Sequence, residues 1–310
     1  MTAKEEYRAL CEDPSLHIPL FQQYWWMETV CHGKTWDVLL ARDDKGLIQG
    51  AMPYHYGKKF GLTFILQPQL TPWCGPWLHP SLEPTERQQV LESLARTLST
   101  RRAALCMQCF SPEITDWQPF YWQGFQQTTR YTHRFPSLAN PDALYAKASR
   151  IRRRYDKEVA AACVVDEHLS LDEFVPFHIG YYKRRGEHDL IPEPLLRTVV
   201  STACRRNQGL LWGLRRRHDG TLMAAWFVAY DSRCAWSLLL AIGKEAPKGA
   251  MSYLMWQVLR QLSTCTESFD FEGGMEANLA FFYRSFGTEQ TPYHCIYRSR
   301  WPFLTRLLHL

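Results

Sequence analysis

The second half of the chain carries two spacings of apolar positions, one typical of strands and one typical of helices. Three apolar runs separated by short polar turns predict adjacent β-strands: 210–217, 222–230 and 233–242. Apolar positions recurring every three to four residues predict helices at 170–186, 191–209, 248–264 and 275–286. Shorter apolar segments predict further strands at 268–272 and 291–298.

Local end signals support two of these helices. Ser170 followed by Glu173 is the spacing of a capping box, in which each side chain serves a backbone group of the other residue. The segment 191–209 has prolines in its first turn and Gly209 at its end, the usual asymmetry of a helix.

The first half repeats part of this order. PFYWQGFQQTTRYTH and FFYRSFGTEQTPYHC share Phe, Tyr, Thr and Tyr at one constant offset, which places Tyr121 on Tyr283. The segments 38–56 and 212–230 each read as an apolar strand, a charged turn with glycine and a second apolar strand. Two segment pairs in the same order indicate an internal duplication.

The chain is therefore expected to form two domains, 1–140 and 141–310, which suits its 310 residues. Pro136, Asn140 and Pro141 interrupt the apolar pattern at the boundary. The predicted fold class is α/β (α+β), with a mixed, mostly antiparallel sheet flanked by helices in each domain.

Composition and charge exclude several classes of protein. Hydrophobic residues make up 46% of the chain, which excludes a disordered protein. The net charge of +5 suits an anionic substrate or cofactor without requiring a nucleic acid, so DNA is not an expected partner. The charged N-terminus and the absence of a long apolar run predict a cytoplasmic protein without a membrane span.

Ten cysteines lie scattered through apolar runs and are expected to be reduced core residues. Cys106 and Cys109 form a CxxC, for which a redox or zinc pair is the alternative interpretation. No second pair with metal-ligand spacing accompanies them, so no metal is predicted.

Several short motifs of the second half occur in a recognisable order. A basic segment SRIRRRYDKEV precedes YYKRRG, the loop KEAPKGAM, the strand end FDFEGG and the helix end FYRSFG. With the duplication, this order resembles the GNAT acyltransferase superfamily and, within it, the Fem-like branch that carries two GNAT domains in one chain. The resemblance covers the second half best.

The resemblance implies an acyl donor bound at the start of the helix after KEAPKGAM. A helix N-terminus attracts the pyrophosphate of coenzyme A, so acetyl-CoA or another acyl-CoA is the expected donor. Pro247 removes one backbone donor and keeps two alternatives open, an aminoacyl-tRNA donor and an ordinary helix start. The expected donor-binding residues are Lys244, Lys248, Gly249, Ala250 and Ser252.

Two residues are candidates for catalysis. Tyr283 lies four residues before Gly287, as in the last GNAT helix, where a tyrosine can protonate the leaving thiolate; packing is the alternative. Glu272 ends a strand before two glycines and is expected either to accept a proton from the attacking amine or to cap the next helix. Asp270 alternates with the neighbouring phenylalanines and is expected to face the substrate together with Glu272.

The acceptor is expected to be a small-molecule or cell-envelope amine bound between the two domains, as the resemblance suggests. The aromatic, proline-rich loop 71–80 would form one wall, with packing as the alternative. Basic clusters could line a positive groove or form a solvated face. The expected contacts are Trp73, Trp77, Tyr182, Arg185 and Arg216.

The prediction is thus an N-acyltransferase that uses direct attack on a bound acyl donor. Two alternatives stay open, an aminoacyl-tRNA-dependent transferase acting on a cell-wall precursor and a ligand-binding GNAT pair without chemistry.

Overall fold

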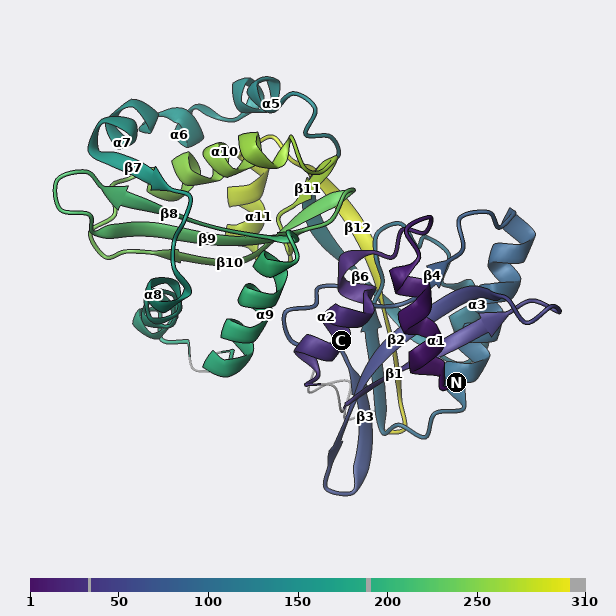
Figure 1. Cartoon of the computed structure of the whole chain (residues 1–310). Coiled ribbons are helices and arrows are strands. Elements are labelled where there is room, and N and C mark those ends of the chain that lie inside the picture. Colours follow the sequence, from purple (N-terminus) through teal and green to yellow (C-terminus); the bar gives the residue numbers. More distant parts are fainter. Residues whose placement is uncertain (33–34, 188–190, 302–310) are drawn as a thin grey trace. The chain divides into compact units, whose positions relative to one another are not determined.

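The computed structural model describes residues 1–32, 35–187 and 191–301, and the chain forms two compact units (Figure 1). The first unit comprises Met1–Arg130 and the residues from Pro292 onward. The second unit comprises Tyr131–Thr291.

This division differs from the predicted domains 1–140 and 141–310. The last strand of each half begins in one unit and ends in the other. Strand β6 (Gln126–Phe135) ends in the second unit, where Phe135 pairs with Phe269. Strand β12 (Glu289–Ser299) ends in the first unit, where it pairs with β5 (Leu105–Cys109). The spacing of apolar residues predicts where strands form but not which strands pair. It therefore does not reveal that β6 and β12 end in the other unit, called the strand exchange below.

The sheet of the first unit has the strand order β1-β2-β3-β5-β12, with β4 paired to β2. Only β3 and β5 pair in parallel. Its remaining strands are β1 (Trp36–Arg42), β2 (Ile48–Lys59), β3 (Leu62–Leu66) and β4 (Trp77–Leu78). Its helices are α1 (Ala3–Glu12), the 3-10 turn Leu20–Gln22, α2 (Tyr24–Val30), α3 (Pro84–Ser99) and α4 (Gln118–Trp122).

The sheet of the second unit has the order β6-β11-β10-β9-β8-β7, and only β10 and β11 pair in parallel. Its further strands are β7 (Cys163–Asp166), β8 (Gly209–Arg216), β9 (Leu222–Tyr230), β10 (Cys234–Ile242) and β11 (Ser268–Asp270). Its helices are α5 (Pro141–Lys147), α6 (Arg150–Arg153), α7 (Asp156–Ala162), α8 (Leu171–Arg184), α9 (Glu193–Arg205), α10 (Ala250–Leu262) and α11 (Ala277–Arg284). Figure 1 shows α8 and α9 on one face of β8–β10 and α10 on the other. The predicted α/β class is confirmed.

Some of the local signals read from the sequence operate in the structure, whereas Gly209 begins β8 and does not end α9, which stops at Arg205. Ser170 caps α8, and its hydroxyl accepts from the backbone N–H of Glu173. Each predicted hairpin forms, β1 with β2 and β8 with β9. Among the described residues, none of the helices combines the length and apolar character needed to cross a membrane.

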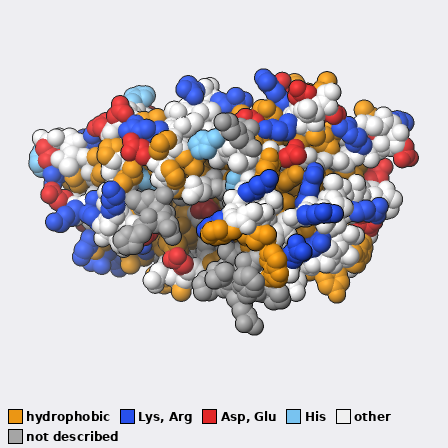
Figure 2. Space-filling model, turned by 90° about the horizontal axis from the view of Figure 1, so that it is seen from below, with side chains coloured by type: hydrophobic (Ala, Val, Ile, Leu, Met, Phe, Trp, Pro, Cys, Tyr) orange, Lys and Arg blue, Asp and Glu red, His pale blue; other side chains and the backbone are white. Residues whose placement is uncertain are grey.

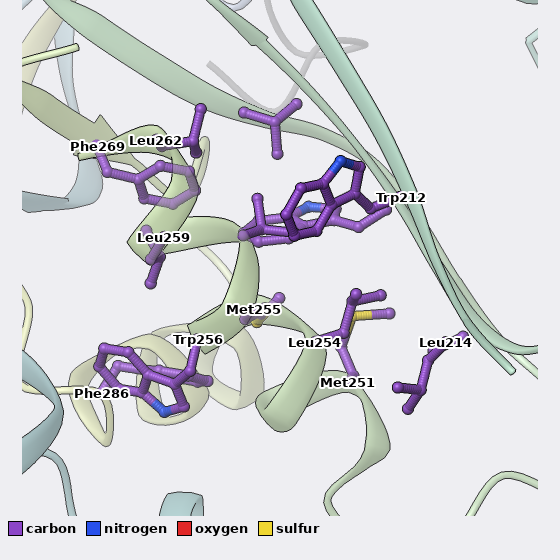
Figure 3. Packing of buried hydrophobic residues seen from close by; sticks show 14 of the residues in the cluster. Trp212, Leu214, Met251, Leu254, Met255, Trp256, Leu259, Leu262, Phe269 and Phe286 are labelled. Carbon is purple, nitrogen blue, oxygen red and sulfur yellow. The ribbon is translucent and has the colours of Figure 1, made fainter. Parts of the chain in front are cut away.

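The core of the second unit forms around α10. Leu254, Met255 and Leu259 have no exposed surface, and Figure 3 shows the helix packed against side chains of β8, among them Trp212 and Leu214. Trp256, on another side of the same helix, contacts Phe286 with ring centroids 5.6 Å apart. The position of α10, and with it the start of this helix, is therefore fixed by close packing.

Replacing Leu259 with alanine should lower the free energy of unfolding by about 2–5 kcal/mol, because a buried leucine leaves a cavity when it is truncated. Urea unfolding followed by circular dichroism measures this change. The matched control is Leu279→Ala in α11, whose side chain is exposed and whose loss should cost roughly 0.5 kcal/mol or less. Equal effects of the two substitutions would contradict this account of the core.

Candidate active site

The parallel strands β10 and β11 part after three paired residues. Cys234, Ala235 and Trp236 pair with Ser268, Phe269 and Asp270, and β11 ends there. Strand β10 continues to Ile242 without a partner on that side in the part of the chain that the structure describes. Beyond the end of β11, the edge of β10 has no strand partner among the described residues, and the Ile242 carbonyl there accepts from Arg184 at 2.9 Å.

The chain leaves β11 through three successive residues with positive φ. The values are 54° at Glu272, 111° at Gly273 and 152° at Gly274. Gly274 has a further reason to be glycine, since a Cβ there would lie 2.8 Å from His133 Cδ2. A glutamate in the left-handed region costs about 1–3 kcal/mol, so the surrounding structure must hold it in place.

Asp270 supplies that hold. Its Oδ1 accepts from the backbone N–H of Glu272 at 2.7 Å and from the hydroxyl of Thr132 at 2.5 Å. The same Thr132 oxygen accepts from the N–H of Gly273 at 3.3 Å. Arg134 Nε lies 3.4 Å from the other carboxylate oxygen.

The observed role of Asp270 differs from the expected substrate contact. Its side chain has no exposed surface, and its described partners are protein groups. Asp270 therefore positions the turn that carries Glu272. The alternation of side chains along the strand predicted that Asp270 faces the same side as Glu272. It did not predict that Asp270 is fully buried.

Glu272 is half-buried at the end of this turn. Burial, and then the charge of Asp270, raise the pKa of Glu272 from its ordinary value near 4.5 to about 8. A carboxyl group with such a pKa can take up and release a proton near neutral pH, as a general base or acid must.

Tyr283 comes from α11 and lies close to Glu272. Its ring contacts Phe271 with centroids 4.9 Å apart. Burial raises the pKa of Tyr283 well above the ordinary value, and the next largest causes are the charges of Glu272 and Tyr182. The phenol is therefore a neutral donor at neutral pH.

The corresponding tyrosine of the first unit lies in a different environment. Tyr121 on α4 is 62% exposed, whereas Tyr283 is 5% exposed. The two residues share a sequence pattern, yet only Tyr283 lies beside a buried carboxyl group. Tyr121 therefore gives no reason to regard Tyr283 as a packing residue alone.

Helix α8 contributes a second phenol. Burial raises the pKa of Tyr182 to about 12, and Glu272 is among the further causes. Its ring lies 4.8 Å from that of His178, whose pKa burial lowers to about 4. The structure thus brings Tyr182 near Glu272 and Tyr283, with a neutral imidazole next to it, and the acceptor contact of Tyr182 stays a prediction. The sequence showed His178 only as an isolated histidine in a helix.

The predicted donor loop leads into an uncapped helix. Gly249 precedes α10 with φ 87° and provides no side-chain cap, so N–H groups of the first turn lack intrahelical partners. A Cβ at Gly249 would also lie 2.8 Å from Tyr155 Cβ. Both the positive φ and this close approach therefore require glycine at position 249. Ala250 and Ser252 are buried in this first turn, while Lys244 and Lys248 are exposed on the loop.

Arg152 adds a cation beside this helix start. Its Nε donates to Ser285 Oγ at 2.6 Å, and its guanidinium lies over the ring of Phe282 at 4.4 Å. Its Nη1 lies 3.5 Å from Ser252 Oγ. The sequence showed Arg152 only as one member of a basic run, because its aromatic and serine partners lie 100 residues or more away.

The two other predicted basic contacts have carboxylate partners. Arg216 pairs with Asp219 at 2.7 Å and with Glu245 at 3.0 Å, which ties the β8–β9 hairpin to the donor loop. Arg185 is exposed at the end of α8 and pairs with Glu187 at 3.0 Å. The ion pair of Arg216 with Glu245 therefore holds the donor loop against the hairpin.

Trp73 and Trp77 are packing residues of the first unit. Both are buried. Trp73 meets Tyr293 edge-on with centroids 5.1 Å apart, and Trp77 Nε1 donates to the His17 carbonyl at 3.0 Å. These contacts account for both side chains, so the predicted acceptor wall gains no support from them.

Charge and metal ligands add little to the site. Figure 2 shows basic side chains at several separate places on the face drawn, with acidic ones between them. Within the described ranges, no group of three or more His, Cys, Asp or Glu side chains could hold a metal ion.

The raised pKa of Glu272 predicts a pH-dependent stability. The unfolded chain releases this proton near pH 4.5 and the folded chain near pH 8, so protonated Glu272 favours folding fully below about 4.5. That contribution is lost as pH rises to about 8. Relative to Glu272→Gln, wild type should lose on the order of 3 kcal/mol over this range, measured by urea unfolding at a series of pH values.

The matched control for this experiment is Glu276→Gln, which neutralises an exposed carboxylate at the start of α11. Its stability profile should run parallel to that of wild type. A parallel profile for Glu272→Gln as well would show that Glu272 titrates as an exposed glutamate.

Comparison with known proteins concerns the family and the fold. Residues 144–278 match the family model described as an acetyltransferase (GNAT) domain. No curated protein matches the chain.

Similar solved structures extend over both units. FemX is 13% identical with a TM-score of 0.70, covering 100% of this chain and 99% of that one. The C-terminal domain of a putative lysylphosphatidylglycerol synthetase from Agrobacterium fabrum is 12% identical with a TM-score of 0.62, covering 99% and 96%. A tandem GNAT protein from the clavulanic acid biosynthesis pathway is 11% identical with a TM-score of 0.55, covering 86% and 83%.

At these identities the likeness concerns the fold, and the resemblance first seen in the short motifs is confirmed. Residues 144–278 of the chain match the GNAT acetyltransferase domain model, and the chain as a whole has the fold that it shares with FemX and the tandem GNAT protein.

Proposed function

We propose that the second unit is an N-acyltransferase that moves an acyl group from acyl-CoA to a small-molecule or cell-envelope amine. The observation that carries this proposal is the meeting of Glu272 and Tyr283 where β10 and β11 part. One is a carboxyl group whose pKa lies near neutral, and the other is a neutral phenol. This pair matches the base and acid that acyl transfer to an amine needs.

The donor would lie at the start of α10. Its pyrophosphate would accept from N–H groups of the first turn, with the positive end of the helix dipole behind them. Lys248 and Arg152 would add positive charge. Packing of α10 against β8 holds this helix end rigid, so the thioester would be oriented before reaction.

The reaction would proceed by direct attack. Glu272 in its carboxylate form would take a proton from the ammonium group of the acceptor, and the free amine would attack the thioester carbon. N–H groups along the unpaired edge of β10 would stabilise the oxyanion. As the intermediate collapses, the carbon–sulfur bond breaks and the Tyr283 hydroxyl would give its proton to the leaving thiolate. The proton that the new amide nitrogen loses would restore the phenol, and Glu272 would release its proton to solvent.

One observation favours a second candidate donor. Pro247 lies two residues before Gly249 and lacks the N–H that a phosphate-binding loop would offer there. An aminoacyl-tRNA, attacked at its ester by the same residues, is the alternative donor. The fold shared with FemX is consistent with it. A GNAT pair that binds a ligand without transfer remains the third hypothesis.

Calorimetric titration with coenzyme A and acetyl-CoA should give a dissociation constant of about 1 μM, or roughly −8 kcal/mol. Lys248→Glu should weaken binding several-fold, because it reverses a charge beside the helix start. Lys45→Glu, in an exposed turn of the first unit, is the matched control and should leave the affinity unchanged. Absence of binding to wild type would exclude the acyl-CoA donor and direct the same titration to aminoacyl-tRNA.

Replacing Tyr283 with phenylalanine should lower turnover about 100-fold, because the leaving thiolate loses its proton donor. Release of free thiol from acetyl-CoA with a panel of amines measures turnover, and calorimetry measures donor affinity, which should stay within about twofold. Tyr121→Phe removes the corresponding exposed hydroxyl of the first unit and serves as control. Unchanged turnover in Tyr283→Phe would remove the assigned role, and donor binding without any transfer in wild type would favour the non-catalytic hypothesis.

A further inference from the structure

Two cysteines of the first unit lie directly opposite each other across a strand pair. Cys109 ends β5, and its cross-strand partner in β12 is Cys295. The Phe110 N–H donates to the His294 carbonyl at 2.8 Å. That bond makes Cys109 and Cys295 a non-hydrogen-bonded pair, in which antiparallel Cα atoms approach to about 4.5 Å. A disulfide spans Cα atoms about 4.4–6.8 Å apart, so the positions are close enough to be joined.

The pair occupies a defined place in the repeated architecture. In the second unit, Asp270 ends β11 and has Arg134 of β6 as its cross-strand partner. There the N–H of Phe271 donates to the carbonyl of His133 at 2.9 Å, the counterpart of the bond from Phe110. The first unit therefore carries two thiols at the place where the second unit carries the ion pair that positions Glu272.

The thiols also influence each other. A hydrogen bond with Cys109, and further the charge of Arg130, lower the pKa of Cys295 although the residue is buried. Burial is the main cause that raises the pKa of Cys74 and of Cys106 to about 12. Arg130, at the end of the first unit, thus favours a thiolate at this pair, and a thiolate is the reactive form of cysteine.

We propose that Cys109 and Cys295 form a dithiol site that a small peroxide oxidises reversibly to a disulfide. The Cys295 thiolate attacks one peroxide oxygen, the oxygen–oxygen bond breaks, and a sulfenic acid forms while the other oxygen leaves as water. Cys109 then attacks the Cys295 sulfur and releases the second oxygen as water. The two thiols together lose two electrons and two protons, and the peroxide is reduced to two water molecules.

The disulfide would have a specific mechanical effect. The chain between Cys109 and Cys295 contains the whole of the second unit, Tyr131–Thr291. Strand β12 is held in the sheet of the first unit by noncovalent pairing in the reduced protein. The bond would fix β12 to β5 covalently and close that long segment into a loop, which restricts the unfolded chain.

The test is oxidation of the folded, full-length protein with hydrogen peroxide, followed by blocking of free thiols and peptide mapping by mass spectrometry without reduction. The expected result is a peptide linked through Cys109 and Cys295, lost on treatment with dithiothreitol. The melting temperature of the oxidised protein should rise by about 5 °C and return on reduction. Cys265 is exposed and reports in the same sample that the oxidant acted.

Cys295→Ala should abolish both the linked peptide and the shift in melting temperature. Cys106→Ala is the matched control, because Cys106 lies on the same strand opposite Arg298 and should leave both results intact. If Cys295→Ala does not fold, the linked peptide from wild type decides the question alone. Oxidised Cys265 without a Cys109–Cys295 linkage would overturn the proposal.

Discussion

The site depends on one buried carboxylate. Asp270 accepts the N–H of Glu272 and the hydroxyl of Thr132, and Thr132 in turn accepts the N–H of Gly273. These bonds hold a glutamate at φ 54°, a conformation that it would not keep unaided. They form at the residue where β11 stops pairing with β10. The end of a parallel strand pair and the orientation of the candidate base are therefore set by the same side chain.

Burial then gives the neighbouring groups their protonation states. Desolvation is the largest cause of the raised pKa of Glu272, Tyr182 and Tyr283, and of the lowered pKa of His178. In each case it favours the uncharged form. Only Glu272 is left with a pKa near neutral, because burial and then the charge of Asp270 raise it from a low ordinary value to about 8, whereas the tyrosines begin near 10 and are raised further. Near neutral pH, Glu272 therefore titrates while Tyr182, Tyr283 and His178 stay uncharged. Such a difference in protonation state is what acid–base chemistry requires.

The sequence predicted those features that depend on residues close together in the chain. The hairpins, the cap at Ser170, the start of α10 at Gly249 and the nearness of Glu272 to Tyr283 all follow from spacing, turn residues or the family resemblance. What they could not give depends on partners distant in sequence. The acidic partners of Arg216, the rings under Arg152 and the exchange of β6 and β12 belong to this second class. Trp73 shows the same limit, because an aromatic side chain in a proline-rich loop suits a binding wall and a core equally well until its neighbour Tyr293 is known.

Corresponding positions in the two units show how one arrangement serves two purposes. Each unit has a parallel strand pair, β3 with β5 or β10 with β11, and the second strand of that pair also pairs with β12 or β6. In the second unit the residue at this junction is a carboxylate, and the next residues are Phe-Glu-Gly-Gly. In the first unit it is a thiol followed by Phe-Ser-Pro-Glu, without the two glycines that permit the left-handed turn. The first unit thus lacks the backbone that would hold a base, and Tyr121 there is free to face solvent. The first unit therefore pairs with β12 but lacks the left-handed turn that holds Glu272 in the second unit. This combination suits a unit that anchors β12 and does not catalyse.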